Sequence, residues 1–250
     1  MIKGGILMTV REAMAPFVLV HGSSGGSWVW RKLAPLLQAA GHDVYAPTLT
    51  GLAERAHLLD CGVDLTMHIT DVANLLMFED LWNVVLVGNS YAGMVITGVA
   101  ATVPERLKLL VYLDAYIPED GQSAVDLWPP ERRAFAAEAE AGGVSEPPPP
   151  ALFGVTDPGL VDWINARMTP HPVSTYTEPV PAGNARSRAI PRVFIHCTGN
   201  PSTTPDVFGP LADKARASGW EVYEIEAGHI AMLTAPSDVA EVLIKVAGQA

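Results

Sequence analysis

Strand-like and helix-like segments alternate along most of this chain of 250 residues. Short apolar runs, such as FVLVHG at 17–22 and NVVLVG at 83–88, precede longer stretches whose apolar residues have helical spacing, and the alternation returns from RVFIHC at 192–197 onward. Such alternation predicts a mostly parallel sheet with helices on both faces, joined by right-handed crossovers. The fold class we expect is therefore α/β.

Residues 117–189 interrupt this alternation, because proline, alanine and glutamate become frequent there, with EPPPP at 146–150. Proline at this density resists the interiors of helices and sheets. We interpret the segment as an inserted helical cap over the strand ends, with one short helix at 129–142, rather than as a linker or a separate domain. The predicted organisation is a core of residues 1–116 and 190–250 with a cap at 117–189.

Charge and apolar patterning exclude several partners. A formal net charge of −11 argues against nucleic acid, because nucleic-acid binding needs basic patches. No apolar run reaches the length of a membrane span, and the N-terminus lacks a signal-peptide pattern, so we expect a cytoplasmic protein. Two cysteines, Cys61 and Cys197, are too few for a disulfide framework. The sequence leaves the oligomeric state open, a homodimer included.

The stretch LVGNSYAGMV at 86–95 raises the main functional question. Ser90 directly follows a buried strand and precedes a helix-like stretch, which is the context of a nucleophile elbow, G-x-S-x-G. The match is imperfect, because Ala92 takes the place of the last glycine and Gly93 comes one residue later. Taken alone, the motif is explained at least as well by a structural strand-to-helix turn.

Two further features favour the catalytic interpretation. The glycine-rich turn in VHGSSGGSWVW at 20–30 can direct N–H groups at a developing oxyanion, whereas the G-x-G-x-x-G spacing of a dinucleotide-binding loop fails there. His229, in EAGHIAMLTAP at 226–236, lies just beyond the last predicted strand. From the carboxyl end of that strand it can act as general base for Ser90.

Taken together, five motifs resemble the α/β-hydrolase superfamily, specifically the small esterase branch of plant methylesterases, hydroxynitrile lyases and their bacterial relatives. They are FVLVHGSSGGSWVW, GLAERAHL, VVLVGNSYAGMV, LLVYLDAYIPEDGQS and GHIAMLTAP, and the likeness runs from Phe17 to Ala247. The resemblance implies the α/β-hydrolase fold, with Ser90 as nucleophile and His229 as base. It also implies an oxyanion hole formed by the N–H groups of Ser23 and Tyr91. Substrate contacts are expected from Ser24, Trp128 and Met232.

The acid of the triad is where the chain departs from the family pattern. Many members carry an aspartate in the loop after the penultimate strand, where this chain has Gly199 and Asn200. Asp206 follows in the same loop, but its position suits the N-cap of a helix better. Asp114 ends LLVYLDA, the strand after the elbow, and we rank it first, although it could equally satisfy loop N–H groups.

We therefore expect a cofactor-free serine hydrolase, without metal, that cleaves carboxylic esters of apolar (aromatic or medium-chain) substrates through an acyl-enzyme. Two alternatives stay open: a lyase resembling the hydroxynitrile lyases, disfavoured because no lysine follows His229, and a catalytically weak ligand-binding member of the same fold. Apolar side chains expected around the pocket are Trp28, Trp128, Phe153, Trp163 and Met232. Among the other histidines, His21 is expected to brace the oxyanion turn, while His57, His68 and His171 show no clustered partner.

Overall fold

The computed structural model describes residues 14–129, 133, 143–199 and 206–250. Its main sheet has six parallel strands in the order β2-β1-β3-β4-β7-β8. These strands are β1 Phe17–Val20, β2 Val44–Tyr45, β3 Val84–Ser90, β4 Leu107–Ala115, β7 Arg192–Cys197 and β8 Glu221–Ile225. Because β1, β3 and β4 are buried along nearly their whole length, they read in the sequence as continuous apolar runs.

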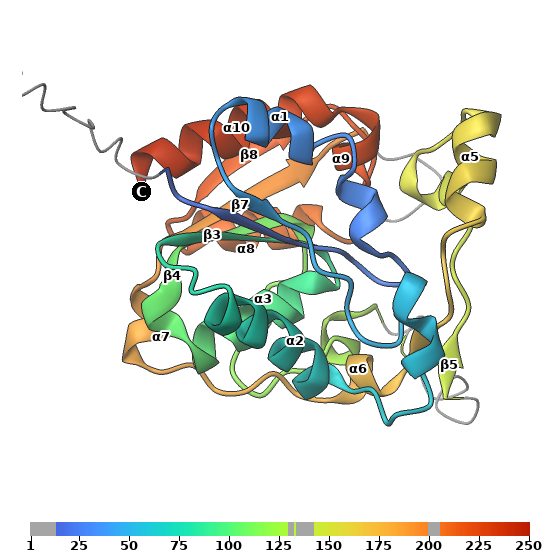
Figure 1. Ribbon diagram of the computed structural model, residues 1–250, viewed down its shortest axis with the longest axis horizontal. Helices are drawn as coiled ribbons and strands as arrows, with labels where there is room; N and C mark the ends of the chain where they lie inside the picture. The colour runs from blue at the N-terminus through green and yellow to red at the C-terminus, as the bar shows by residue number, and fades with distance from the viewer. Residues whose placement is uncertain (1–13, 130–132, 134–142, 200–205) are drawn as a thin grey trace, which may run out of the picture.

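Helices cover both faces of this sheet (Figure 1). One face carries α2 Leu65–Phe78, α3 Ala92–Thr102 and α8 Gly209–Ala217, and the other carries α1 Ala34–Ala39, α9 Ala231–Thr234 and α10 Pro236–Gln249. Short 3-10 helices lie at Ser27–Trp30, Ala53–Leu58 and Pro104–Arg106. The predicted α/β class, with a parallel sheet between two helical layers, is confirmed.

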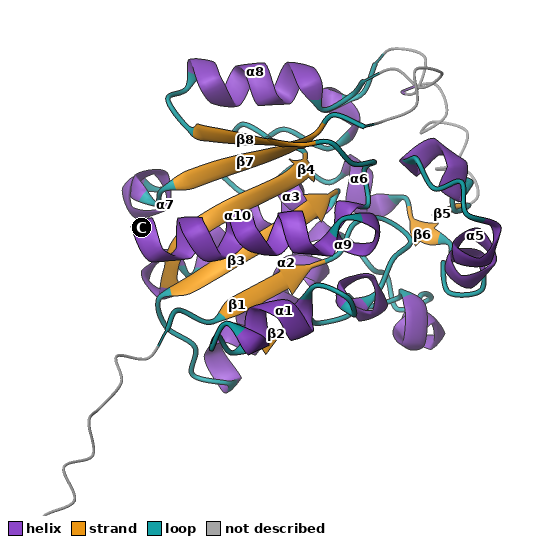
Figure 2. Cartoon of the chain, turned by 90° about the horizontal axis from the view of Figure 1, so that it is seen from above, coloured by secondary structure: helices purple, strands orange, loops and turns teal. Residues whose placement is uncertain are grey.

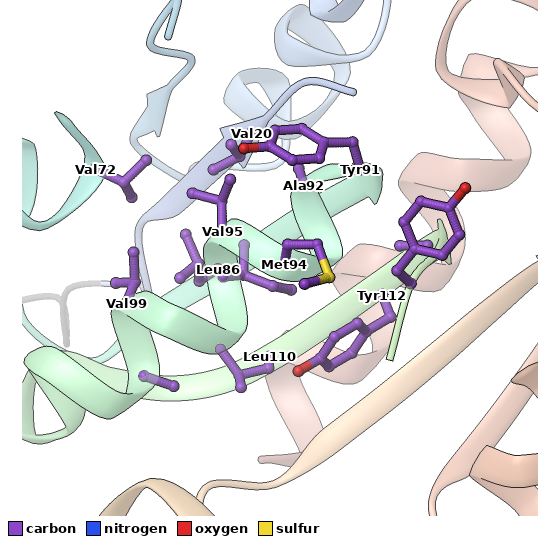
Figure 3. Close-up of a cluster of buried hydrophobic side chains, with 14 of the residues drawn as sticks. Val20, Val72, Leu86, Tyr91, Ala92, Met94, Val95, Val99, Leu110 and Tyr112 are labelled. Atoms are coloured by element: carbon purple, nitrogen blue, oxygen red, sulfur yellow. The ribbon is translucent and has the colours of Figure 1, made fainter. Parts of the chain in front are cut away.

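Close packing explains the small residues of α3. A Cβ on Gly98 would lie 2.1 Å from the Cδ1 atom of Ile69, so glycine at this position lets α2 and α3 approach. Figure 3 shows Val95 and Val99 of α3 gathered with Val20 and Leu86 of the sheet. This apolar layer holds α3 firmly against the strand that ends in Ser90.

The stretch SWVWRKLAPLLQAAG at 27–41 has the apolar spacing of one helix, but the structure divides it. A 3-10 helix spans Ser27–Trp30, and α1 begins only at Ala34. Pro35 lies in the first turn of α1, where its missing N–H costs nothing; further inside a helix it would interrupt the hydrogen-bond ladder. The helix therefore begins at this proline, and Gly41 follows its end with a positive φ of 98°.

The inserted segment, residues 117–189, joins β4 to the last part of the core. Its described part contains the two-stranded antiparallel sheet of β5 Val144–Ser145 and β6 His171–Pro172. It also contains α5 Pro158–Asn165, α6 Ser174–Thr177, α7 Ala185–Ala189 and 3-10 helices at Val125–Leu127 and Pro150–Phe153. The helix predicted at 129–142 lies almost entirely outside the described residues.

The strands point toward the inserted segment. Figure 2 shows the arrowheads of β1, β3 and β4 directed to the side of the molecule where β5, β6 and α5 lie. Ligands of open α/β sheets bind outside the carboxyl ends of the strands, so this side is where a site is expected. Every helix among the described residues is too short or too polar to cross a bilayer.

Candidate active site

Ser90 is the last residue of β3 and has a positive φ of 57°. For a residue with a side chain this left-handed conformation is strained, and such strain is often found where function requires it. Tyr91 follows as the N-cap of α3, which begins at Ala92. The chain therefore makes the sharp strand-to-helix turn that an elbow needs, with Ser90 partly exposed at its tip.

Three glycines allow close contacts around this turn, each with a different neighbour. A Cβ on Gly88 would lie 2.7 Å from the carbonyl oxygen of Ala92, and one on Gly22 would lie 2.8 Å from the Cβ of Ser90. A Cβ on Gly93 would lie 2.0 Å from the carbonyl oxygen of Tyr116. The late glycine of the motif thus serves the contact between α3 and the segment after β4.

Asp114 reaches the site through a β-bulge. Residue Asn89 pairs with Leu113 and Ser90 pairs with Ala115, so Asp114 is the extra residue of β4, with a φ of 45°. A bulge changes the direction of a side chain at a strand end. The carboxylate of Asp114 is fully buried. Its Oδ1 accepts a hydrogen bond from the Cys197 N–H at 3.1 Å, and its Oδ2 lies 2.7 Å from His229 Nδ1.

His229 follows β8 and is held from several sides. Asn89 Nδ2 donates to the carbonyl oxygens of Leu113 at 3.0 Å and His229 at 3.4 Å. The ring of Phe208 stacks on the imidazole, with centroids 4.7 Å apart and planes 11° apart, and the Phe153 ring lies 5.4 Å away. With Nδ1 directed at Asp114, Nε2 is the nitrogen that can accept a proton.

The predicted oxyanion turn, residues 22–25, is braced by His21. The Leu49 N–H donates to His21 Nε2 at 3.1 Å, so the ring proton is on Nδ1, which donates to the Gly22 carbonyl at 2.8 Å. Burial lowers the pKa of His21 to about 4, which keeps the ring neutral. Within the described residues, neither the Ser23 N–H nor the Tyr91 N–H donates to a protein acceptor. Both therefore remain available to an oxyanion.

These groups open into one cavity of about 830 Å³ at the carboxyl ends of the strands. The predicted site residues Ser23, Ser24, Ser90 and His229 line it. Its walls are mostly apolar and come from both the core and the inserted segment; they include Trp28, Val29, Leu152, Phe153, Ile164, Met168, Tyr176, Val207, Phe208, Ile230 and Leu233. A cavity of this size suits a small organic molecule.

Not every residue expected at the pocket lines it in the structure. Trp128 is buried against Tyr176, with ring centroids 5.0 Å apart, and only Tyr176 lines the cavity. Met232 is fully buried in the core beside α10, because its neighbours Ile230 and Leu233 take the cavity side. Trp163 packs edge-on against Trp28 at 5.3 Å instead of lining the wall.

The interpretation that His68 and His171 lack clustered partners is wrong. Their rings lie 6.1 Å apart and each contacts the ring of Tyr91. The His68 Nε2–H donates to the Thr50 carbonyl at 2.9 Å, so the Tyr91 hydroxyl donates to His68 Nδ1 at 3.0 Å. Burial lowers the pKa of both histidines. Sequence spacing gave no sign of this cluster, because its members come from distant segments.

Of the two alternatives to Asp114 as the acid, Asn200 and Asp206, the structure describes only Asp206. Asn200 lies outside the described residues. Asp206 accepts hydrogen bonds from the N–H groups of Phe208 at 3.0 Å and Gly209 at 2.8 Å, at the start of α8, and its Oδ2 lies 3.5 Å from His196 Nε2. Its carboxylate therefore serves a helix N-terminus, as its position in the sequence suggests. Two contributors that sequence reasoning missed are Asn89 and Phe208.

Comparison with known proteins gives a consistent picture. A family model described as the alpha/beta hydrolase family matches residues 17–242. The carbendazim hydrolyzing esterase of Nocardioides sp. (strain SG-4G) is 40% identical over 92% of this chain and 98% of its own. Methylesterase 10 of Arabidopsis thaliana is 28% identical over 96% and 94%. An extracellular alpha/beta-hydrolase from a Paenibacillus species, described as sharing structural and functional homology with tobacco salicylic acid binding protein 2, matches with a TM-score of 0.80, 25% identity and coverages of 92% and 98%.

Proposed function

The chain belongs to the alpha/beta hydrolase family, and from this premise we propose that it is a cofactor-free serine esterase with Ser90, His229 and Asp114 as its triad. One observation carries the proposal. Ser90, strained at the elbow, lines the same cavity as His229, and Nδ1 of that histidine lies 2.7 Å from a fully buried carboxylate. The esterases among its relatives support ester hydrolysis as the reaction class.

In the proposed reaction Ser90 Oγ attacks the ester carbonyl while His229 Nε2 takes its proton. The carbonyl oxygen gains negative charge and is stabilised by the N–H groups of Ser23 and Tyr91. Asp114 holds the imidazole in the required tautomer and stabilises its charged form. His229 then gives the proton to the leaving alcohol. Water, activated by the same histidine, cleaves the acyl-enzyme to acid and free Ser90.

The cavity supports apolar esters as substrates. Its walls are aromatic and aliphatic near Ser90, and Glu146 is the one aspartate, glutamate, lysine or arginine among the described lining residues. Burial of an aromatic or medium-chain group against such walls provides binding energy at about 25 cal/mol per Å² of apolar surface. Lactones, methyl esters and aryl esters all satisfy this requirement.

The esterase is favoured over a lyase acting on cyanohydrins. Cyanide chemistry in the hydroxynitrile lyases that the chain resembles depends on a lysine close to the catalytic histidine. Here Ile230, Ala231 and Met232 follow His229. Within the described part of the chain, no lysine or arginine lines the cavity. Among these described lining residues, a departing cyanide anion would find no lysine or arginine to stabilise it.

The proposal is tested by Ser90→Ala together with a fluorophosphonate probe. Wild type is expected to be labelled at Ser90 and to hydrolyse p-nitrophenyl esters, with a preference for certain chain lengths. Ser90→Ala is expected to lose labelling and to lose about 10⁴-fold or more in kcat while it keeps its fold. Ser218→Ala, the same change at an exposed serine at the end of α8, is the matched control and should keep both labelling and kcat. An unlabelled wild type would instead indicate a ligand-binding member of the fold.

The inserted segment is proposed to act as a cap that sets substrate size. Its residues Leu152, Phe153, Ile164, Met168 and Tyr176 line the cavity opposite the sheet, which supports this role. The core boundaries at 116 and 190, the cytoplasmic location and the homodimer alternative stay predictions.

A further inference from the structure

His171 belongs to the inserted segment, yet its imidazole is fully buried against the core. Its ring stacks on Tyr176 with centroids 4.6 Å apart and meets Tyr91 edge-on at 4.9 Å. Its Nδ1 accepts a hydrogen bond from the Ser24 N–H at 3.2 Å. The Thr169 N–H donates to the Ser24 carbonyl, also at 3.2 Å. Residues 169–171 therefore hold both polar groups of the Ser24 backbone.

The hydrogen bonds around His171 define one tautomer. Because the Ser24 N–H can only donate, Nδ1 carries the lone pair and the proton is on Nε2. That Nε2–H donates to Thr175 Oγ1 at 2.8 Å, and the Thr175 hydroxyl donates to the Pro172 carbonyl at 2.8 Å. Burial and the nearby His68 hold the pKa of His171 well below its usual range. The ring is thus a fixed neutral acceptor.

Ser24 needs such an anchor because its backbone is strained. Its φ is 59°, in the left-handed region, within the turn that the Gly25 N–H closes on the Gly22 carbonyl at 3.4 Å. For a residue with a Cβ this conformation is strained, because the Cβ crowds the following carbonyl oxygen. Rotation of the peptide between Ser23 and Ser24 would relieve it. The rotation would also leave a buried N–H without an acceptor, which is unfavourable, so the hydrogen bond to His171 offsets the strain.

We propose that His171 is a positioning residue for the proposed ester hydrolysis, acting through Ser24 to keep the Ser23 N–H directed at the oxyanion. The inference rests on the proposed function. The inference extends the proposed function, because it gives the inserted segment a role in the chemistry as well as in substrate size. His171 does not line the cavity, so it acts without touching substrate. The hydrogen bond to His171 occupies the Ser24 N–H, which leaves Ser23 as the donor on this side of the oxyanion.

Two substitutions separate the acceptor from the ring. His171→Phe keeps an aromatic ring against Tyr176 but removes the acceptor for Ser24. His171→Gln loses the ring but supplies a carbonyl oxygen for Ser24 and an amide N–H for Thr175. His42→Phe is the matched control, since His42 is also buried and its Nδ1 bonds a backbone oxygen, that of Ala15 at 2.8 Å, away from the cavity.

The readouts are kcat, KM and inhibition by two matched ligands, a trifluoromethyl ketone and the product alcohol. The hemiketal that the ketone forms with Ser90 places an oxyanion in the hole, whereas the alcohol does not. His171→Phe is expected to lower kcat about 10- to 100-fold, because a small misplacement of a catalytic group has this effect. Ketone affinity should fall with it, while KM and alcohol inhibition stay within about threefold. His171→Gln should recover most of the loss, and His42→Phe should keep wild-type kcat.

Three results would overturn the inference. One is a kcat of His171→Phe within threefold of wild type. Another is an equal loss in His171→Gln. The third is a parallel loss of alcohol binding, which would indicate a collapsed pocket. Failure of the proposed function looks different, because wild type itself would then resist the fluorophosphonate probe and leave esters intact.

Discussion

Replacing Asp114 with asparagine tests the acid of the proposed triad while keeping its size and shape. Asp114 is fully buried, and its two oxygens have different partners: the Cys197 N–H at 3.1 Å and His229 Nδ1 at 2.7 Å. The Cys197 N–H can only donate, so the carbonyl oxygen of the new asparagine must face it. The NH₂ group then faces His229.

This orientation forces the wrong tautomer on His229. An amide N–H directed at Nδ1 requires a lone pair there, so the ring proton moves to Nε2, which then cannot take the proton of Ser90. Turning the amide round would oppose two donors at Cys197, at a cost of about 1–3 kcal/mol. Even the turned fraction lacks the negative charge that stabilises the imidazolium. Together these effects predict a loss in kcat on the order of 10⁴-fold.

The assay is the hydrolysis of a good p-nitrophenyl ester, with a thermal melt to verify folding. Asp206→Asn is the matched control, because the same atoms change at a half-exposed carboxylate that serves α8. It should keep kcat within about threefold of wild type, because asparagine keeps the side-chain oxygen that accepts from the Phe208 and Gly209 N–H groups. Asn200→Ala should also cost little. The reasoning is refuted if Asp114→Asn stays within tenfold of wild type, or if Asn200→Ala is the crippling change.

Three further outcomes follow from the packing and from the buried histidines. Trp128→Ala should shift the preference among ester chain lengths through Tyr176 and leave the pH profile of kcat unchanged; a shifted profile would place Trp128 nearer the chemistry. Gly93→Ala should lower the free energy of unfolding in urea by about 3 kcal/mol or more, since its Cβ would lie 2.0 Å from a carbonyl oxygen, whereas Gly248→Ala, in open space near the end of α10, should change it by less than about 1 kcal/mol. The pKa of His21 is lowered to about 4 by burial, so the unfolded chain binds the extra proton first. The contribution of His21 to the free energy of unfolding should therefore be fully present above pH 6.5, the ordinary pKa of histidine, and should fall by roughly 1 kcal/mol per pH unit between pH 6.5 and 4. Urea unfolding at a series of pH values that showed no such decline would contradict this prediction.

The core of the fold was predictable because its signals are local. The runs that became β1, β3 and β4 are mostly apolar, and a segment with helical spacing follows both β1 and β3. Such patterns report burial on both faces without reference to distant residues. The same reasoning placed Ser90 and His229 after strands, and parallel strands bring their carboxyl ends to one edge.

The finer features of the site depend on contacts that sequence separation hides. The bulge at Asp114 is set by the pairing of β3 with β4, and no residue type marks it in the sequence. Gly93 answers to Tyr116, and Ser24 bonds His171 across 147 residues of chain. Trp128 looked like a wall residue because it is large and lies in the insertion, yet Tyr176 takes the cavity side. Size and position in the sequence cannot decide which of two rings packed edge to face lines a cavity.

Backbone strain links these features to the proposed chemistry. Six described residues other than glycine have positive φ, and three of them, Ser24, Ser90 and Asp114, carry a role at the candidate site. At about 1 kcal/mol or more each, these conformations persist only where neighbouring structure holds them. Strand pairing within the core holds Ser90 and Asp114, whereas hydrogen bonds from the inserted segment hold Ser24. Local opening of that segment would therefore release the oxyanion turn and leave the Asp114–His229 pair in place.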